Sequence, residues 1–213
     1  MSDAGDHQSG CRIDGDLLRG ELNETGLELA AAGFAALWHG RPVLPTELLP
    51  DRASLLGDIT ALVQHGRAEI DPDGRLVGIH GLTLRTTRHR FVHDGSAHHT
   101  WCAFDSIGIP AALRLDATAH TDCPACQRRI TVDIVGGVPD DSAFALWLPA
   151  SADGNLIANF CAHADLYCSR EHLGRNIDTA RTSGDIADLA AAVSLGCDVW
   201  ADVASVTLDE ASS

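Results

Sequence analysis

Apolar side chains recur at helical spacing in the first part of the chain. Over residues 26–38 they mark one predicted helix, which Gly40 and the prolines after it bring to an end. Thr46 is placed to cap a short second helix, because its hydroxyl can accept a backbone hydrogen bond. A third predicted helix spans residues 52–66 and carries apolar side chains along one side: Leu55, Leu56, Ile59, Leu62 and Val63.

A β-hairpin is predicted directly after these helices. Residues 68–79 contain two short apolar runs separated by Asp73-Gly74, a dipeptide suited to the positive φ of a tight turn. Three helices and a hairpin predict a winged-helix-like module over residues 21–80, after a polar tail without periodicity at residues 1–20. Acidic residues in or beside the third helix outnumber its arginines, so we expect this module to cover substrate or serve structure instead of reading DNA.

From about Gly81 onward, the pattern changes to short runs typical of β-strands. These runs lie at residues 82–86, 88–93, 113–119, 129–135, 143–148 and 156–166. Helices are expected to flank the strands at residues 102–112 and 184–197. The predicted fold class is α+β, with the three-helix winged-helix-like module packed on a mixed β-sheet core over residues 81–213.

Composition and charge narrow the class of protein. A chain of 213 residues that is 45% hydrophobic and 21% charged has the composition of an ordinary globular protein. No run approaches the roughly 18 apolar residues that span a bilayer, and the polar start of the chain differs from a signal peptide, so we expect a cytoplasmic protein without a membrane partner. The net charge of −15 disfavours a nucleic-acid partner. We interpret the short cluster Arg85, Arg88 and Arg90 as a solvated strand face.

Cysteine is frequent, with seven residues at positions 11, 102, 123, 126, 161, 168 and 197. Structural disulfides rarely persist in a reducing compartment, and an odd count favours metal binding or thiol chemistry. A buried free cysteine also packs as a small hydrophobe, so any one of these residues taken singly is expected to be inert. We assign no role to Cys11, which lies in the polar tail.

Cys102 and Asp105 form the first candidate pair. If a helix begins at Cys102, the positive end of the helix dipole lowers the pKa of its thiol, and Asp105 projects from the same face one turn later. Four apolar residues around the pair should raise the carboxyl pKa by desolvation: Trp101, Phe104, Ile107 and Ile109. The alternative is that Cys102 packs in the core and Asp105 caps the helix or pairs with a cation.

A second candidate group lies in the run that ends near Leu166. If residues 156–166 form a strand, alternation places Cys161, His163 and Asp165 on one face. This face would bear a thiol and two polar groups. The alternative is that His163 and Asp165 bind loops above the sheet while Cys161 packs inside.

Cys123 and Cys126 form a Cys-x-x-Cys knuckle between two strand-like runs. A single knuckle supplies half of a structural zinc site, which needs four ligands. Cys161, His163 and Cys168 are the candidates for the other two ligands. A redox-sensitive pair or a merely packed pair is the alternative.

Together, the segments around these cysteines resemble the organomercurial (alkylmercury) lyases. The similarity rests on motifs that follow one another in the family order and spacing: Trp101-Cys102-Ala103-x-Asp105, a cysteine near Cys123, and Phe160-Cys161-x-His163. The upstream segments Gly40-Arg-Pro-Val43 and Gly81-Leu-Thr-Leu-Arg85 are also similar to family segments, so the resemblance covers roughly residues 25–205.

The resemblance implies an enzyme that breaks the carbon-mercury bond of organomercury compounds by protonolysis. Its implied catalytic set is Cys102, Asp105 and Cys161. Two thiolates would capture mercury, for which they are the preferred ligands, while Asp105 accepts a thiol proton and delivers it to carbon. The products would be a hydrocarbon and Hg(II) held by the two sulfurs, with or without a carboxylate oxygen as a further ligand. No organic cofactor is required, and cellular thiols or a mercuric reductase would take the ion.

The chain also departs from this family pattern. Ala162 follows Cys161 where some members carry another cysteine. The remaining cysteines are additions that either bind a structural metal such as zinc or pass Hg(II) outward: Cys126, Cys168 and Cys197. The alternative function is a non-enzymatic thiolate metal-binding or metal-sensing protein on the same scaffold, which would not need Asp105 as an acid.

Overall fold

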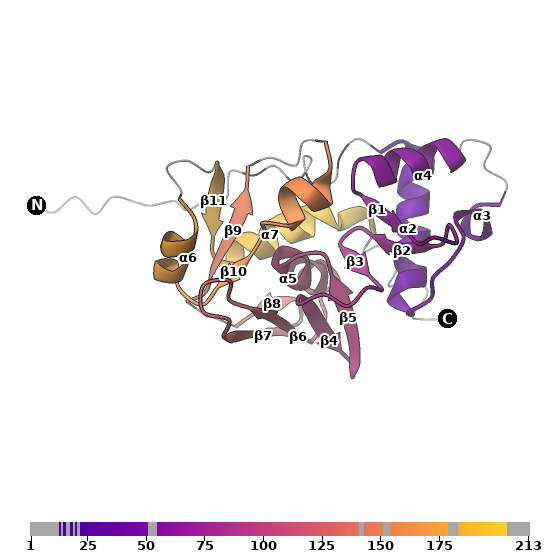
Figure 1. Ribbon diagram of the computed structural model, residues 1–213. Helices are drawn as coiled ribbons and strands as arrows, with labels where there is room; N and C mark the ends of the chain where they lie inside the picture. Colours follow the sequence, from indigo (N-terminus) through magenta and orange to yellow (C-terminus); the bar gives the residue numbers. More distant parts are fainter. Residues whose placement is uncertain are drawn as a thin grey trace, which may run out of the picture.

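The computed structural model describes residues 13, 15, 18, 20, 22–50, 55–140, 143–150, 154–178 and 183–203. Helices α2, α3 and α4 lie at one end of the molecule, strands β9 to β11 with α6 lie at the other, and a larger sheet lies between them (Figure 1). Most of the predicted tail, including Cys11, falls outside the described residues. Among those residues, no helix is long and apolar enough to cross a membrane.

The N-terminal helices lie where the sequence predicts them, although Leu56, one of the predicted apolar positions of the third helix, is exposed. Helix α2 spans Glu24–Trp38 and begins after Asn23, whose side chain accepts a hydrogen bond from the Gly26 N–H at 2.7 Å. Helix α4 spans Leu55–Gln64 and buries Leu55, Ile59 and Leu62, three of the predicted apolar positions. Helix α3, Pro45–Leu48, begins one residue before the predicted cap, because proline at the first helical position needs no N–H partner.

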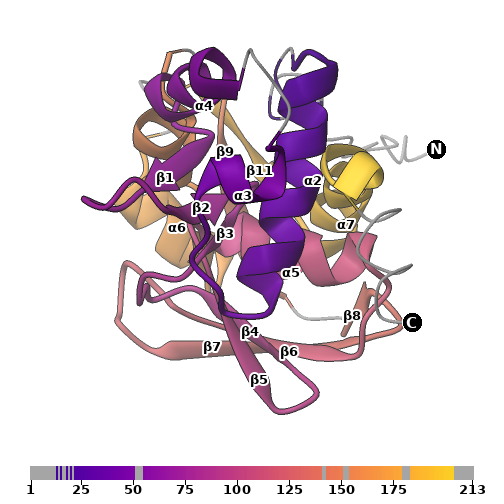
Figure 2. The ribbon, with the colours of Figure 1, turned by 90° about the vertical axis from the view of Figure 1, so that its right-hand side faces the viewer.

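A sheet of eight strands follows, counted over the described residues and ordered β1-β2-β3-β5-β4-β6-β7-β8. Its bounds are β1 Ala68–Ile70, β2 Leu76–Ile79, β3 Leu82–Thr83, β4 Arg90–His93, β5 Ser96–Thr100, β6 Ala117–Asp122, β7 Arg129–Val135 and β8 Val138–Pro139. The predicted turn between β1 and β2 is present, with Gly74 at φ 78°. Figure 2 shows β4 to β7 spread below helix α5, Ala103–Ala112.

The prediction of a mixed sheet is wrong. Every strand pair in the described residues is antiparallel, in the large sheet and in the smaller sheet alike. Short turns connect most neighbouring strands, and only antiparallel strands can be joined by so few residues. The strand predicted at 113–119 begins later than expected. Helix α5 ends near Leu113, Arg114 adopts φ 53°, and β6 begins at Ala117.

The C-terminal part covers α5 and forms the second sheet. This sheet has the order β10-β9-β11 in the described residues, with β9 at Ala145–Pro149, β10 at Leu166–Tyr167 and β11 at Gly184–Ala187. The helix predicted at 184–197 is therefore wrong at its start, because its first four residues form β11. Asp188 then caps helix α7, Leu189–Val199. Helix α7 crosses α5 so closely that a Cβ on Gly196 would lie 2.6 Å from the Cα of Gly108.

The predicted strand at 156–166 is also wrong. Residues Ile157–Cys161 form a short π-helix, and the Asn155 side chain accepts a hydrogen bond from the Ala158 N–H at 2.9 Å at its start. Only β10 at the end of this run is extended, and helix α6, Arg170–Asn176, follows it. A short apolar run fits a buried helix and a strand equally well, so its period could not decide between them.

Candidate active site

Cys102 lies at the junction between β5 and α5. It is the N-cap residue of α5, with extended backbone angles of φ −143° and ψ 176°, and its backbone N–H donates to Asp105 Oδ2 at 3.1 Å. The Thr100 hydroxyl donates to the Cys102 carbonyl at 3.0 Å. Helix capping therefore holds the carboxyl group of Asp105 beside Cys102.

Cys161 reaches the same place from the π-helix. The segment after it is joined to α5 by a hydrogen bond from the Ala103 N–H to the Ala164 carbonyl at 3.2 Å. The rings of Phe104 and Phe160 meet edge to face with centroids 6.2 Å apart. The ligand atoms of Cys102, Asp105 and Cys161 all lie within 4.8 Å of one another, and all three residues are buried. We call this group the buried cluster.

Burial controls the ionisation of Asp105. Desolvation raises its carboxyl pKa from the usual 3.8 to about 7, although hydrogen bonds from Cys102 and the Trp101 backbone oppose the shift. The predicted rise in carboxyl pKa is therefore confirmed. Near neutral pH, this group can both accept and release a proton.

The thiols behave differently from the prediction. Burial raises the pKa of Cys102 well above its usual value, and the hydrogen bond with Cys161 and the charge of Asp105 add to the rise. For Cys161, the hydrogen bond with Cys102 lowers the pKa, but burial and Asp105 together outweigh it and the net shift is upward. The predicted lowering at the helix start is wrong because desolvation exceeds the dipole effect. Thiolate formation at this cluster therefore requires a nearby base.

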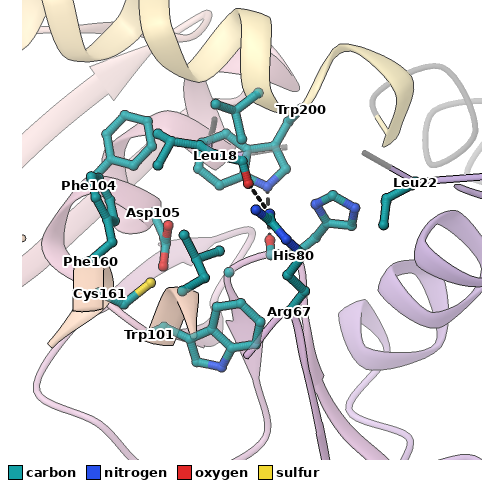
Figure 3. A pocket seen from close by; sticks show the side chains of 13 residues that line it. Leu18, Leu22, Arg67, His80, Trp101, Phe104, Asp105, Phe160, Cys161 and Trp200 are labelled. Carbon is teal, nitrogen blue, oxygen red and sulfur yellow. Dashed lines mark hydrogen bonds between the residues drawn. The ribbon is translucent and has the colours of Figure 1, made fainter. Parts of the chain in front are cut away.

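A small pocket opens beside the buried cluster. Figure 3 shows Asp105 and the Cys161 sulfur facing one another at one end of it, and the Arg67 guanidinium further along. Its lining is largely apolar and comes from segments far apart in the sequence: Leu18, Leu22, Arg67, His80, Gly81, Trp101, Phe104, Asp105, Leu156, Phe160, Cys161, Val199 and Trp200. Cys102 is not in this lining, so Cys161 is the more accessible thiol.

Of the four apolar residues predicted to surround Cys102 and Asp105, two line the pocket and two do not. Trp101 and Phe104 face it, and Trp101 Nε1 donates to Glu69 Oε2 at 2.6 Å, which fixes the indole ring. Ile107 and Ile109 are fully buried elsewhere in α5. The sequence reasoning missed Arg67, His80 and Trp200, because distant segments bring them to the pocket and none of them belongs to a motif.

The predicted face of Cys161, His163 and Asp165 does not exist as a site. Asp165 instead accepts a hydrogen bond from Arg88 Nη2 at 2.6 Å, in a partly buried ion pair. Burial raises the pKa of this carboxyl, and the charge of Arg88 opposes the shift. Arg88 is exposed, as predicted for a solvated face, but it lies outside the strands and its charge also compensates a carboxylate of low exposure.

A second cysteine group lies at the other end of the large sheet. Cys123, Cys126, Cys168 and His172 place their ligand atoms within 4.8 Å of one another. Of the predicted partners for the knuckle, Cys168 is present, while Cys161 and His163 are not in the group. His172 was missed, although its position four residues after Cys168 is a spacing found in zinc sites. We call this group the outer cluster.

Comparisons with known proteins point to one family. The sequence profile of the family described as "MerB: Alkylmercury lyase" matches residues 82–201. The chain is 33% identical to the alkylmercury lyase of Pseudomonas putida over 106 residues, which is 47% of this chain and 49% of that protein. It is 31% identical to the Streptomyces lividans alkylmercury lyase over 143 residues, with 62% and 64% of the two chains covered. For the Bacillus cereus alkylmercury lyase the identity is 36% over 124 residues, covering 58% and 56%.

These matches cover about half to two thirds of the length of the curated relatives. The fold similarity extends further. A crystal structure described as the mercury-bound form of MerB2 superposes with a TM-score of 0.79 over 89% of this chain and 96% of that chain, at 19% sequence identity. The family profile spans more than half of the chain and includes all three residues of the buried cluster. The chain therefore belongs to the alkylmercury lyase family.

Proposed function

We propose that this protein is an organomercurial lyase that cleaves carbon-mercury bonds by protonolysis. The observation that carries the proposal is the buried cluster, in which Asp105, with a pKa of about 7, lies within 4.8 Å of two thiols. Mercury is a soft cation that prefers thiolate ligands, and a carboxyl group of this pKa supplies the proton that a departing carbanion needs. A protein that only binds mercury does not need this proton donor.

Capture of the substrate begins at Cys161. This thiol faces the pocket, and thiol exchange transfers the organomercury cation to its sulfur while the original thiol ligand leaves with the Cys161 proton. Cys102 then gives its proton to the Asp105 carboxylate and binds the same mercury atom as a thiolate. The high pKa of Cys102 makes this transfer dependent on metal coordination, because mercury binding stabilises the thiolate.

Protonolysis completes the reaction. The protonated Asp105 donates its proton to the carbon atom, the carbon-mercury bond breaks, and its electron pair forms the new carbon-hydrogen bond. Mercury keeps its +2 oxidation state and stays on the two sulfurs, with an Asp105 oxygen available as a third ligand. The steps conserve protons and need no external reductant or organic cofactor. We propose cellular thiols or a mercuric reductase as the acceptor of the ion.

The surroundings support a cytoplasmic organomercury substrate. The pocket lining is apolar enough to receive an alkyl or aryl group, and the thiols of the cluster persist best in a reducing compartment. We also propose that residues 21–80 form a winged-helix-like module that covers the substrate, while residues 81–213 form the catalytic core. In support of this division, Leu22 and Arg67 contribute to the pocket from the N-terminal part.

The decisive experiment compares the parent protein with Asp105→Asn. Both are reduced and incubated with phenylmercury and excess thiol, and benzene is measured by gas chromatography. We expect the variant to bind phenylmercury with the parent's stoichiometry and to release benzene at a rate lower by about 10³-fold. Benzene release at the parent's rate contradicts the role of Asp105. Mercury binding without benzene release in the parent itself supports a metal-binding or metal-sensing protein instead.

A further inference from the structure

The outer cluster contains a turn whose backbone already has the form of a metal-binding knuckle. Cys123 follows β6, its backbone N–H donates to the Arg128 carbonyl at 3.0 Å, and its carbonyl accepts from the Gln127 N–H at 2.8 Å. Gln127 adopts φ 60°, a left-handed conformation that costs free energy for any residue with a Cβ. The turn therefore holds Cys123 and Cys126 on one side at the expense of local strain.

The other two members come from a different sheet. Cys168 follows β10, and His172 lies in the first turn of α6. Ser169 caps α6 and accepts a hydrogen bond from the His172 N–H at 3.2 Å, which fixes the backbone that carries the imidazole. The β6–β7 turn lies beside β10 and α6 in Figure 1.

The distances within the outer cluster fit a tetrahedral ion. Zinc-sulfur bonds of about 2.3 Å and zinc-nitrogen bonds of about 2.0 Å place two sulfurs about 3.8 Å apart and a sulfur and a nitrogen about 3.5 Å apart. The Sγ atom of Cys168 lies 3.6 Å from that of Cys123 and 3.6 Å from that of Cys126. The Nδ1 atom of His172 lies 3.8 Å from the Cys123 sulfur. The Cys168 to His172 separation, at 2.9 Å, must widen, and the remaining pairs of ligand atoms lie within 4.8 Å of one another.

We propose that Cys123, Cys126, Cys168 and His172 bind one structural zinc ion. Three thiolates and one imidazole make a closed four-ligand site, which leaves no coordination position for substrate. The arrangement differs from the buried cluster, which offers two sulfurs and a carboxylate and opens on a pocket. The proposal does not rest on lyase activity.

The zinc ion would join the two sheets. Its ligands connect the β6–β7 turn of the large sheet to the segment between β10 and α6 in the small sheet. Cys168 lies seven residues after Cys161, so the same link restrains the segment that carries the substrate-facing thiol. A disulfide is a poorer match to the geometry, because each 3.6 Å sulfur-sulfur separation exceeds the roughly 2.05 Å of a bond.

Metal analysis of the full-length protein tests this assignment. The parent, purified without chelator from zinc-supplied cells, should contain about one zinc ion per chain by mass spectrometry. Cys126→Ser and His172→Ala should each reduce the zinc content at least about tenfold, while His172→Cys should retain it because a fourth thiolate replaces the imidazole. Cys197→Ser, which alters an exposed thiol outside both clusters, is the matched control.

Cobalt provides an independent readout on the same proteins. Replacing zinc with cobalt(II) should give the strong visible absorption of a tetrahedral thiolate site in the parent and in Cys102→Ser, and not in Cys126→Ser. The proposal is overturned if the parent binds neither metal, or if Cys126→Ser and His172→Ala keep the zinc. It is also overturned if Cys102→Ser loses the ion, since the metal would then occupy the buried cluster. None of these outcomes depends on whether the parent releases benzene, which is measured separately and tests the lyase function.

Discussion

The two cysteine clusters differ in what accompanies the sulfur. In each, the ligand atoms lie within 4.8 Å of one another, so proximity alone does not distinguish them. The buried cluster pairs two thiols with a carboxyl group and borders a pocket, whereas the outer cluster has a third thiol and an imidazole in place of the carboxyl. A proton source and an open coordination position favour chemistry, and a complete ligand set favours structure.

The first prediction separates the two clusters by the property that a variant in each should lose, which is hydrocarbon release for the buried cluster and zinc for the outer cluster. Cys161→Ser should lower the rate of hydrocarbon release by about 10³-fold or more, because the thiolate that faces the pocket is gone, and it should keep the zinc content of the parent. Cys126→Ser should lose zinc but still cleave phenylmercury at temperatures where it stays folded. The measurements are benzene release and metal content on the same preparations. If both variants lose both properties together, the clusters do not act separately.

The second prediction concerns the cost of holding Asp105 in the buried cluster. Raising its pKa from 3.8 to about 7 penalises the ionised carboxylate by roughly 4 kcal/mol. The folded state favours the protonated acid, so this contribution to stability is fully present below pH 3.8 and is lost as pH rises through about 7. Asp105→Asn should therefore increase the free energy of unfolding at pH 8 by up to about 4 kcal/mol, and by almost nothing near pH 4.

Urea unfolding of the parent and Asp105→Asn across this pH range measures the effect. The outer cluster provides the contrast, because removing a ligand there should destabilise the protein. If the Asn variant is less stable than the parent at pH 8, the carboxylate is better solvated or better paired than its burial indicates.

Local patterns predicted the parts of this fold that local interactions determine. The helix at Glu24–Trp38, the turn at Gly74 and the strand at Arg129–Val135 lie where periodicity and turn residues placed them. In the last of these, buried and exposed residues alternate throughout, so the period was unambiguous. The segment Ile157–Cys161 had an apolar run that fits two conformations, and its packing against Phe104 is a long-range contact that no period encodes.

The candidate sites also combine features that local sequence predicts with features that depend on long-range contacts. Cys102 and Asp105 are one helical turn apart, and the family resemblance supplied Cys161 as their partner. The direction of the Cys102 pKa depends on complete burial, which sequence reasoning underestimated against the helix dipole. His172 joins the outer cluster only because β10 lies next to the β6–β7 turn, and that neighbour relation follows from the topology of two sheets.

The third prediction tests how tightly the buried cluster is positioned. Gly81 has φ 85°, and a Cβ there would lie 2.9 Å from the carboxyl carbon of Asp105. Gly95 has a similar φ of 77° with nothing within 4 Å of the added atom. Both alanine variants should lose about 1–2 kcal/mol of stability through left-handed strain. Only Gly81→Ala should also lower the rate of hydrocarbon release, by roughly 10- to 100-fold, because Asp105 must move. Equal rates in the two variants would show that the carboxyl group tolerates displacement.

The last prediction is the pH dependence of the reaction. Asp105 must be ionised to accept the Cys102 proton, so kcat/KM should be highest above its pKa of about 7 and fall about tenfold per pH unit below it. The observed value belongs to the cluster as a whole, because the carboxyl and the thiols share protons. Benzene release is measured between pH 5 and pH 9 at a constant concentration of the thiolate form of the added thiol, which removes the titration of the reagent. Cys126→Ser should keep the profile of the parent, since the outer cluster exchanges no proton with the substrate. A rate that stays constant from pH 9 down to pH 5 would place Asp105 in a solvated environment and would remove its advantage as a proton donor at neutral pH.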